Sequence, residues 1–126
     1  SFCRKNSIVL TAYAPLGSAD RPARLKKDGE PSLLSNPVIA GIAEKHGITA
    51  GQALLRWGLQ RETVVIPKSV NPDRLRENLA AAEPGPALDG EDIAAIATLD
   101  LKYRYVDGSF WTPPKSPYTI KELWDE

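Results

Sequence analysis

The chain has 126 residues, of which 42% are hydrophobic and 25% charged, as in an ordinary soluble folded domain. Its sixteen basic and sixteen acidic residues cancel, which argues against partners bound by bulk charge, such as nucleic acid or an anionic membrane. Any anion site must therefore be local. No apolar run is long enough to cross a bilayer, and the N-terminus shows no signal-peptide pattern.

The N-terminal residues predict the end of a helix, and the cysteine count predicts a reducing compartment. The single cysteine, Cys3, permits no internal disulfide, which favours a reducing compartment and predicts a cytoplasmic location. We expect Cys3 to pack at a helix end rather than to act as a nucleophile. Residues 1–6 are predicted to be the last turn of a helix that begins before Ser1. The sequence contains no methionine, so we expect that Ser1 is not a translation start.

Residues 8–12 are predicted to form a strand, because they make a continuous apolar run. A run that is apolar on both faces suits a parallel sheet covered by helices. Residues 18–35, by contrast, are polar and show no clear periodicity. Loops longer than about 12–15 residues in compact domains are usually functional or disordered. We therefore expect residues 18–35 to form a loop that is either functional or disordered.

Two helices are predicted next from their capping signals. Asn36-Pro37 is a cap-plus-proline start, and Gly47 ends the helix that it opens. Thr49-x-x-Gln52 is a capping box, which opens a second helix that runs to about Gln60.

Two conspicuous side chains of these helices are assigned structural roles. His46, the one histidine of the chain, lies in the last turn of the first helix, where a charged imidazole favours the helix dipole. We expect it to be a surface residue rather than a catalytic one. Trp57, in the second helix, is expected to pack in the core rather than to contact a ligand.

The most informative stretch is residues 64–79. Residues 64–66 predict a short buried strand, and Asn71-Pro72 opens a helix with the same cap-plus-proline signal. Leu75 and Leu79 lie four residues apart, on the side of this helix that we expect to be buried.

The charges at the start of this helix are unusual. Lys68 and Arg74 crowd an N-terminus that already carries partial positive charge, which is unfavourable unless an anion binds there. Free backbone N–H groups, the Ser69 hydroxyl and the two cations could converge on a phosphate. Glu77 and Asn78, one turn further on, could then hydrogen-bond an adenine edge. A capped surface helix with solvated charges explains the same residues, so the residue chemistry alone leaves both interpretations open.

The C-terminal third begins with a break and ends in an aromatic tail. Residues 83–86 interrupt the chain with glycine and two prolines. Asp89 is predicted to cap the next helix, with Leu88 and Ile93 placed as a hydrophobic staple. Residues 100–126 hold six of the nine aromatic residues, and their prolines forbid a long helix. We expect this tail to drape over the rest of the structure to bury its rings.

Two motifs carry a resemblance to a known family. Ile-Pro-Lys-Ser at residues 66–69, followed after four residues by Arg-x-x-Glu-Asn, closely resembles the NADPH-binding signature of the aldo-keto reductases. Tyr-Ala-Pro-Leu-Gly-Ser at residues 13–18 resembles the segment after that family's seventh strand. The similarity is good over residues 1–99 and loose in the tail. The ending, residues 116–124, is most similar to plant-type members.

The resemblance implies an α/β fold, the C-terminal part of a (β/α)8 TIM barrel with its seventh and eighth strands, their helices and the C-terminal loop. Residues 1–126 would then be part of a single barrel domain, with residues 100–126 its aromatic-rich C-terminal loop and tail. Such a barrel typically needs about 250 residues, so we expect the chain to be about half of one. A monomer is expected if the full barrel is present.

The resemblance also implies NADPH or NADP as cofactor. Lys68, Ser69 and Arg74 would hold the adenosine 2′-phosphate, and Glu77 and Asn78 the adenine. The full set of implied cofactor-binding residues is Tyr13, Ala14, Leu16, Ser18, Asp20, Lys68, Ser69, Val70, Asn71, Arg74, Glu77 and Asn78.

Several of these assignments have alternatives or depart from the family pattern. Tyr13 would stack on the nicotinamide, although a barrel-rim aromatic is the other interpretation. Ala14 replaces a serine common in the family, so a backbone contact would survive and a hydroxyl contact would not. Asn71 stands where a threonine is often found. The family's loop folds over the bound cofactor, and Asp20 is expected to latch it by pairing with Lys68.

The tail supplies candidate substrate contacts, but the chain supplies no catalytic residue. Phe110 and Trp111 are candidates for the substrate pocket, and packing at the barrel edge explains them equally well. The family reduces aldehydes or ketones to alcohols by hydride transfer from NADPH, with a tyrosine donating the proton. That tyrosine and the lysine, aspartate and histidine that assist it cannot be mapped onto this sequence, and we predict no metal site.

Three functions are therefore weighed. The first is the NADPH-binding portion of an oxidoreductase whose partner is a small aldehyde or ketone substrate. The second is a non-catalytic nucleotide-binding or regulatory half-barrel, which would need a partner to cover its open strand edges. The third is a phosphate-binding module for another ligand.

Overall fold

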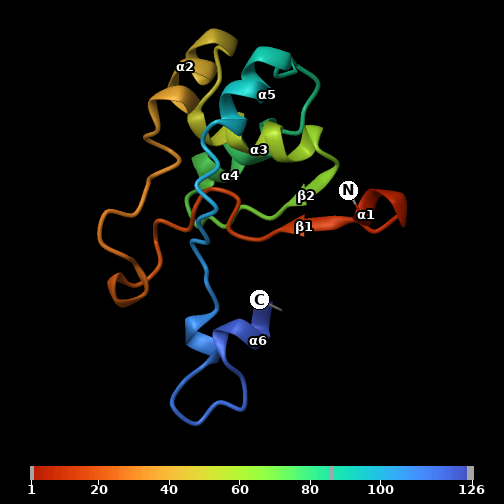
Figure 1. Ribbon diagram of the computed structural model, residues 1–126. Coiled ribbons are helices and arrows are strands. Elements are labelled where there is room, and N and C mark those ends of the chain that lie inside the picture. The colour runs from red at the N-terminus through yellow and green to blue at the C-terminus, as the bar shows by residue number, and fades with distance from the viewer. Residues whose placement is uncertain (1, 86, 125–126) are drawn as a thin grey trace.

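The computed structural model describes residues 2–85 and 87–124 and has the predicted α/β class (Figure 1). In chain order its elements are α1 (Phe2–Lys5), β1 (Leu10–Ala12), η1 (Ala23–Leu25), α2 (Pro37–His46), α3 (Ala50–Gln60), β2 (Thr63–Val65), α4 (Pro72–Ala80), α5 (Gly90–Ala97), η2 (Ser109–Trp111) and α6 (Ile120–Trp124). Parts of the predicted first turn, chain break and tail, at residues 1, 86 and 125–126, lie outside the described residues. Within the described ranges, no helix is long and apolar enough to cross a membrane.

The sheet consists of two parallel strands, in which Thr11 pairs with Val64 and Ala12 with Val65. Helix α3 packs against β2 on one face of this sheet. The approach is so close that a Cβ atom on Gly58 would lie 2.8 Å from Val65 Cγ1. A glycine at this position therefore lets the helix lie directly on the strand.

Within the part of the chain that the structure describes, the opposite face of the sheet is uncovered, and both strands are shorter than predicted. β1 begins at Leu10 rather than at Ile8, and β2 ends at Val65 rather than at Ile66. Val64 and Ile66 are 46% and 53% exposed, so the prediction of a buried strand is wrong for this face. A strand is buried only when both faces are covered and both edges paired, and two strands with helices on one side provide neither.

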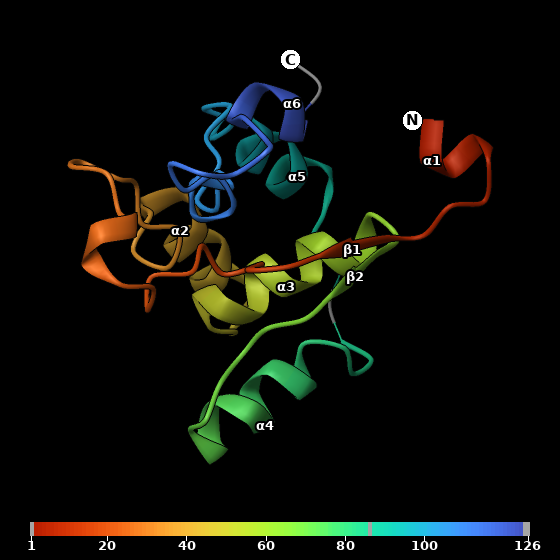
Figure 2. The ribbon, with the colours of Figure 1, turned by 90° about the horizontal axis from the view of Figure 1, so that it is seen from below.

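The hydrophobic core lies where α2 and α3 pack together and α5 packs on α2. Ile39 is fully buried in it, and Trp57 packs against it as predicted. Figure 2 shows α4 apart from α2 and α5, with α3 between them. Helix α3 is thus the element that joins the core to α4 and to the sheet.

All four predicted helix starts are confirmed. The caps of α2, α3, α4 and α5 are Asn36, Thr49, Asn71 and Asp89, and each side chain accepts a hydrogen bond from a backbone N–H of the first turn. Gly47 ends α2 with φ 62°, a left-handed conformation that glycine adopts without strain. These signals predict well because a cap depends only on residues within one turn of it.

Helix α4 forms as predicted, but its leucine side is exposed rather than buried. Leu75 is 49% and Leu79 is 70% exposed. The helix contacts α3 through its other side, which carries Glu77. Spacing identifies which residues share a helix face, but not whether a neighbour covers it.

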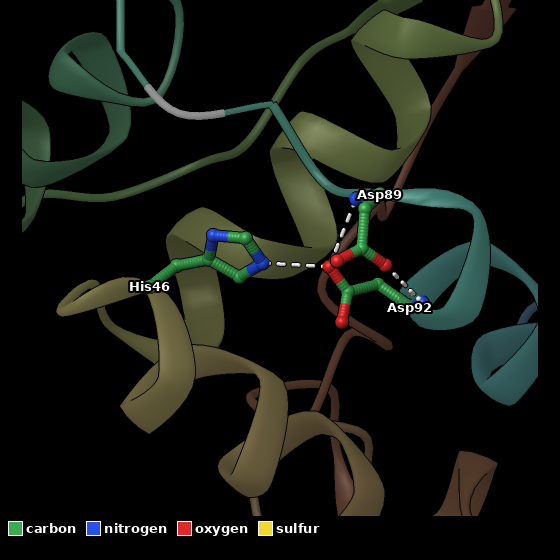
Figure 3. A group of neighbouring side chains, drawn as sticks. All are labelled: His46, Asp89 and Asp92. Carbon is green, nitrogen blue, oxygen red and sulfur yellow. Dashed lines mark hydrogen bonds and ion pairs between the residues drawn. The ribbon is translucent and has the colours of Figure 1, made fainter.

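His46 is not the surface residue that the sequence predicted, since its side chain is only 10% exposed. Its Nε2 atom lies 2.6 Å from Asp92 Oδ2 (Figure 3). Lys45 Nζ lies 2.6 Å from Asp89 Oδ2 and 2.9 Å from Asp92 Oδ1. The basic end of α2 is thereby fastened to the acidic start of α5, an arrangement that both helix dipoles favour.

The Asp92 carboxylate is the buried member of this cluster, with 3% of the residue exposed. Burial alone would raise its pKa. Hydrogen bonds from Lys45, from the Asp89 N–H and with His46 outweigh burial and hold the pKa well below the ordinary value of 3.8. A group whose pKa is lowered by folding stabilises the folded state above its unfolded pKa, and that stabilisation is lost as the pH falls.

We expect Asp92→Asn to lower the free energy of unfolding by about 2 kcal/mol at pH 7, because it removes the charge from a buried hydrogen-bonded group. The deficit should shrink as the pH falls below 3.8, because the carboxyl of the unfolded chain then binds a proton that the folded-state carboxylate does not, and this favours unfolding of the unsubstituted protein. Chemical denaturation of the complete polypeptide between pH 7 and pH 3 measures both effects. The control is Asp73→Asn. The Asp73 carboxylate pairs with Arg76 but is 89% exposed, so this substitution should lower the free energy of unfolding by less than about 0.5 kcal/mol. A deficit that is the same at every pH would contradict this assignment.

The C-terminal tail is packed in its first part and open in its second. Tyr103 and Tyr105 are half-buried against the loop of residues 18–35, and their rings meet edge to face with centroids 5.1 Å apart. Phe110 and Trp111 are 48% and 64% exposed. Figure 1 shows α6 well apart from the α2, α3 and α5 group. The expectation that the tail buries its rings is therefore correct only for the first two tyrosines and for Trp124, which is half-buried.

Candidate functional site

A groove of about 650 Å³ lies where both strands end, and we call it the strand-end groove. It is bounded by the segment after β1, the segment after β2 and the first turns of α4. The predicted cofactor residues that line it are Ala14, Leu16, Ser18, Asp20, Lys68, Ser69, Val70, Asn71, Arg74, Glu77 and Asn78. Tyr13 is the only member of the predicted set outside this lining, and it is 55% exposed. The fold thus gathers residues from two segments that are some fifty positions apart.

The cationic corner of the groove is formed by Lys68 and Arg74. In the part of the chain that the structure describes, the Arg74 guanidinium makes no hydrogen bond or ion pair. Arg76, two positions further along α4, instead lies 2.7 Å from Asp73 Oδ1 and does not line the groove. One of the two neighbouring arginines is therefore neutralised locally, and the one in the groove is not.

The backbone at this helix start is less available to an anion than the sequence suggested. Asn71 Oδ1 accepts hydrogen bonds from the N–H groups of Asp73 and Arg74, at 2.8 Å and 3.2 Å. The Asn71 N–H is itself bonded to Ser69 Oγ at 3.1 Å. The expectation of free N–H groups is wrong for these three. The side chains of Lys68, Ser69 and Arg74 remain as the donors of the corner.

Lys68 is held by a residue of the loop that follows β1. Its Nζ atom lies 2.9 Å from Asp20 Oδ2, the pairing that the sequence predicted. The hydrogen bond and charge of Lys68 lower the Asp20 pKa, so this carboxyl is ionised at neutral pH. Both side chains are more than 60% exposed, so the pair is weak and can open. The contact bridges the two walls of the groove.

Glu77 is fixed by α3, a contact that sequence analysis missed. The Thr49 hydroxyl donates to Glu77 Oε1, and Gln52 Nε2 donates to the Glu77 carbonyl at 3.1 Å. Gly51, which is buried, lets α3 approach, since a Cβ there would lie 3.2 Å from Glu77 Oε1. The capping box of α3 thus has a second task, to orient a side chain of the groove. No local sequence pattern signals a contact made across 28 residues.

The structure does not bring Phe110 and Trp111 to the strand-end groove. Their rings lie against each other with centroids 4.6 Å apart. Trp111 lines a separate, mainly apolar hollow of about 510 Å³ within the tail, together with Pro113, Lys115, Ser116, Pro117, Tyr118 and Leu123. The assignment of these two rings to a substrate pocket remains a prediction.

Among the described residues, one cluster has side chains spaced to hold a metal ion: His46, Asp89 and Asp92. The Lys45 ammonium already bridges the two carboxylates. Asp89 Oδ1 also accepts the N–H groups of Glu91 and Asp92 as a helix cap. The cluster is accounted for by its structural contacts, and we assign it to the joint between α2 and α5.

Comparison with known proteins identifies the family. The sequence profile described as the aldo/keto reductase family matches residues 1–101. The chain belongs to the aldo/keto reductase family. The resemblance found in the two motifs is therefore confirmed.

The relatives come from distant organisms. An aldo/keto reductase of the cyanobacterium Synechocystis is 56% identical over 126 residues, all of this chain and 38% of the relative. Aldo-keto reductase family 1 member A1 of Mus musculus is 39% identical over 106 residues, 84% of this chain and 31% of the relative. The NADP-dependent D-sorbitol-6-phosphate dehydrogenase of Malus domestica is 44% identical over 103 residues, 82% of this chain and 32% of the relative. The chain thus spans about a third of the length of these curated relatives.

Proposed function

We propose that this chain is the NADPH-binding, C-terminal part of a (β/α)8 barrel, and that the complete protein reduces aldehydes and ketones to alcohols. The observation that carries the proposal is the strand-end groove, which contains all the predicted cofactor residues except Tyr13. The position of the groove supports it, because ligands of parallel α/β folds bind beyond the carboxyl ends of the strands. The apple relative, by its name, is NADP-dependent.

The cationic corner would select the nucleotide. Lys68, Ser69 and Arg74 would hold the 2′-phosphate through charge-assisted hydrogen bonds, which are stronger than bonds between neutral groups. The 2′-phosphate would relieve the repulsion between two cations at a helix start whose dipole adds further positive potential. Asn71 would act mainly as the helix cap that keeps this corner in shape.

The remaining groove residues would orient the rest of the cofactor. Glu77, already fixed by Thr49, and Asn78 would hydrogen-bond the adenine edge. Ala14, Leu16 and Ser18 would contact the pyrophosphate and ribose from the segment after β1. Tyr13, exposed at the end of β1, would stack on the nicotinamide.

The cofactor would supply the hydride, and this chain would hold it in place. We assign no catalytic residue to the chain, and we expect the proton donor to come from the part of the barrel that precedes it. A small aldehyde or ketone is the proposed substrate. Cytoplasmic location and a monomeric full barrel remain predictions.

The half-barrel alternative is disfavoured by the surface that the described chain leaves uncovered. Val64 and Ile66 on the sheet, and Leu75 and Leu79 on α4, are large apolar side chains that are 46% to 70% exposed. Together they are apolar surface that a stable protein buries against a partner or against further chain. The rest of a barrel would cover the sheet face and pair both strand edges.

NADPH should bind the complete polypeptide at least about tenfold more tightly than NADH, because one charge-assisted hydrogen bond to the 2′-phosphate corresponds to about this difference in affinity. Lys68→Met and Arg74→Met should each remove most of that preference and leave NADH binding nearly unchanged. Equilibrium titration by nicotinamide fluorescence measures the six affinities, those of the three proteins for NADPH and for NADH.

The matched control is Arg76→Met, on the same helix but outside the groove, which should leave both affinities as they were. Equal affinity of the unsubstituted protein for NADPH and NADH would contradict the role of the cationic corner. It would favour a phosphate-binding module for another ligand.

The Asp20–Lys68 pair should slow cofactor release, because it bridges the walls of the groove in front of the bound nucleotide. We expect Asp20→Ala to speed NADPH dissociation by about threefold, the size of one exposed ion pair. Stopped-flow displacement measures the rate. Asp28→Ala, the same change elsewhere on the same exposed loop, is the control and should have no effect. An unchanged rate in Asp20→Ala would rule out the latch.

A further inference from the structure

Arg21 ties together the loop that contains Asp20. Its guanidinium donates to the carbonyls of Ser18 and Leu25, at 3.0 Å and 3.1 Å, and more weakly to that of Gly17 at 3.3 Å. A further guanidinium N–H donates to the Glu30 carboxylate. One side chain therefore fixes the start, the middle and the far end of the segment from residue 17 to residue 30.

The ion pair at the centre of this arrangement is shielded from solvent. The side chains of Arg21 and Glu30 are 9% and 12% exposed, whereas those of Lys68 and Asp20 are 70% and 64% exposed. Burial opposes ionisation of Glu30, but hydrogen bonds from Tyr103 and Arg21 outweigh it, and the Glu30 pKa lies below its ordinary value. A shielded pair with several hydrogen bonds holds its geometry far better than an exposed one.

The C-terminal tail completes the network. The Tyr103 hydroxyl donates to Glu30 Oε2 at 2.8 Å, and the Tyr105 hydroxyl donates to the Pro31 carbonyl at 2.9 Å. The Arg21 guanidinium lies 5.8 Å from the centre of the Tyr105 ring. The segment that follows α5 is thus joined to the loop at the residues that anchor Arg21.

Asp20 precedes Arg21 in the same loop, and its side chain is exposed. Its carboxylate pairs with Lys68, and Arg21 holds the backbone before and after it through the carbonyls of Ser18 and Leu25. We propose that Arg21, Glu30 and Tyr103 form a positioning network through which the C-terminal tail holds Asp20 over the strand-end groove and so slows release of the nucleotide.

This inference rests on the proposed function, because it assumes that NADPH occupies the groove. The inference adds a second role for the tail: besides the predicted contact with substrate, the tail controls the dissociation rate of the cofactor. Arg21, Glu30 and Tyr103 do not line the groove and act through Asp20. Their substitution should change the dissociation rate of NADPH much more than its association rate.

The test is a double-mutant cycle on NADPH dissociation in the complete polypeptide. Glu30→Gln removes the charge that anchors Arg21 and should speed release by about threefold, as loss of the exposed Asp20 pair would. In an Asp20→Asn background, the same Glu30→Gln substitution should have no further effect, because the contact that it positions is already gone. Equal effects of Glu30→Gln in both backgrounds would overturn the network.

Glu62→Gln is the matched control for this cycle. It makes the same chemical change in an ion pair with Arg4, just before β2 and away from the groove, and should leave release unchanged. Tyr103→Phe removes only one hydroxyl and should speed release by about twofold, again only when Asp20 is present. If Glu30→Gln does not fold, an unchanged release rate in Tyr103→Phe overturns the inference.

The outcomes separate this inference from the function on which it rests. An unsubstituted protein that does not bind NADPH sinks the proposed function. An unsubstituted protein that binds NADPH, with the same release rate in Glu30→Gln, sinks the positioning network alone.

Discussion

The placement of two cations at the start of one helix is the constraint on which the rest of this structure depends. Lys68 and Arg74 both line the strand-end groove, at the end of α4 where the helix dipole adds positive potential. Asn71 satisfies the first N–H groups of the helix, so the backbone contributes less to anion binding than the two side chains do. Two cations beside a helix N-terminus favour a dianionic group there, which is why we propose that the site selects a phosphate.

Each neighbouring element helps to hold this corner. Helix α3 lies on β2 through Gly58 and reaches α4 through Thr49, so the strand, the two helices and Glu77 form one rigid support. Helix α5 is fastened to α2 by Asp92, which stabilises the core against which α3 packs. The loop that crosses the groove is held within itself and to the tail by the shielded Arg21–Glu30 pair and Tyr103, but the Asp20–Lys68 pair that joins it to the other wall is exposed. A firmly supported groove closed by one weak contact suits the binding and release of a large nucleotide that we propose for this site.

The sequence predicted the features that depend on near neighbours. The four helix starts and the residues of the groove followed from local signals and from a family motif whose letters lie close together. Apart from the Asp20–Lys68 pairing, which the family resemblance suggested, it failed where distant segments meet. His46 was expected at the surface, but Asp92, 46 residues away, buries it. Leu75 and Leu79 were expected to be buried, yet they are 49% and 70% exposed. Spacing defines a face, and only the fold decides what lies against it.

Phosphorus NMR of bound NADP tests the cationic corner most directly, because it observes the 2′-phosphate itself. The second pKa of a phosphate monoester lies near 6, and nearby cations favour its dianion. With the nucleotide bound to the complete polypeptide, the 2′-phosphate resonance should stay at its dianionic position to a pH about one unit lower than in free NADP. In Lys68→Met that shift should shrink. A bound 2′-phosphate that titrates as it does in free solution would show that Lys68 and Arg74 do not hold it.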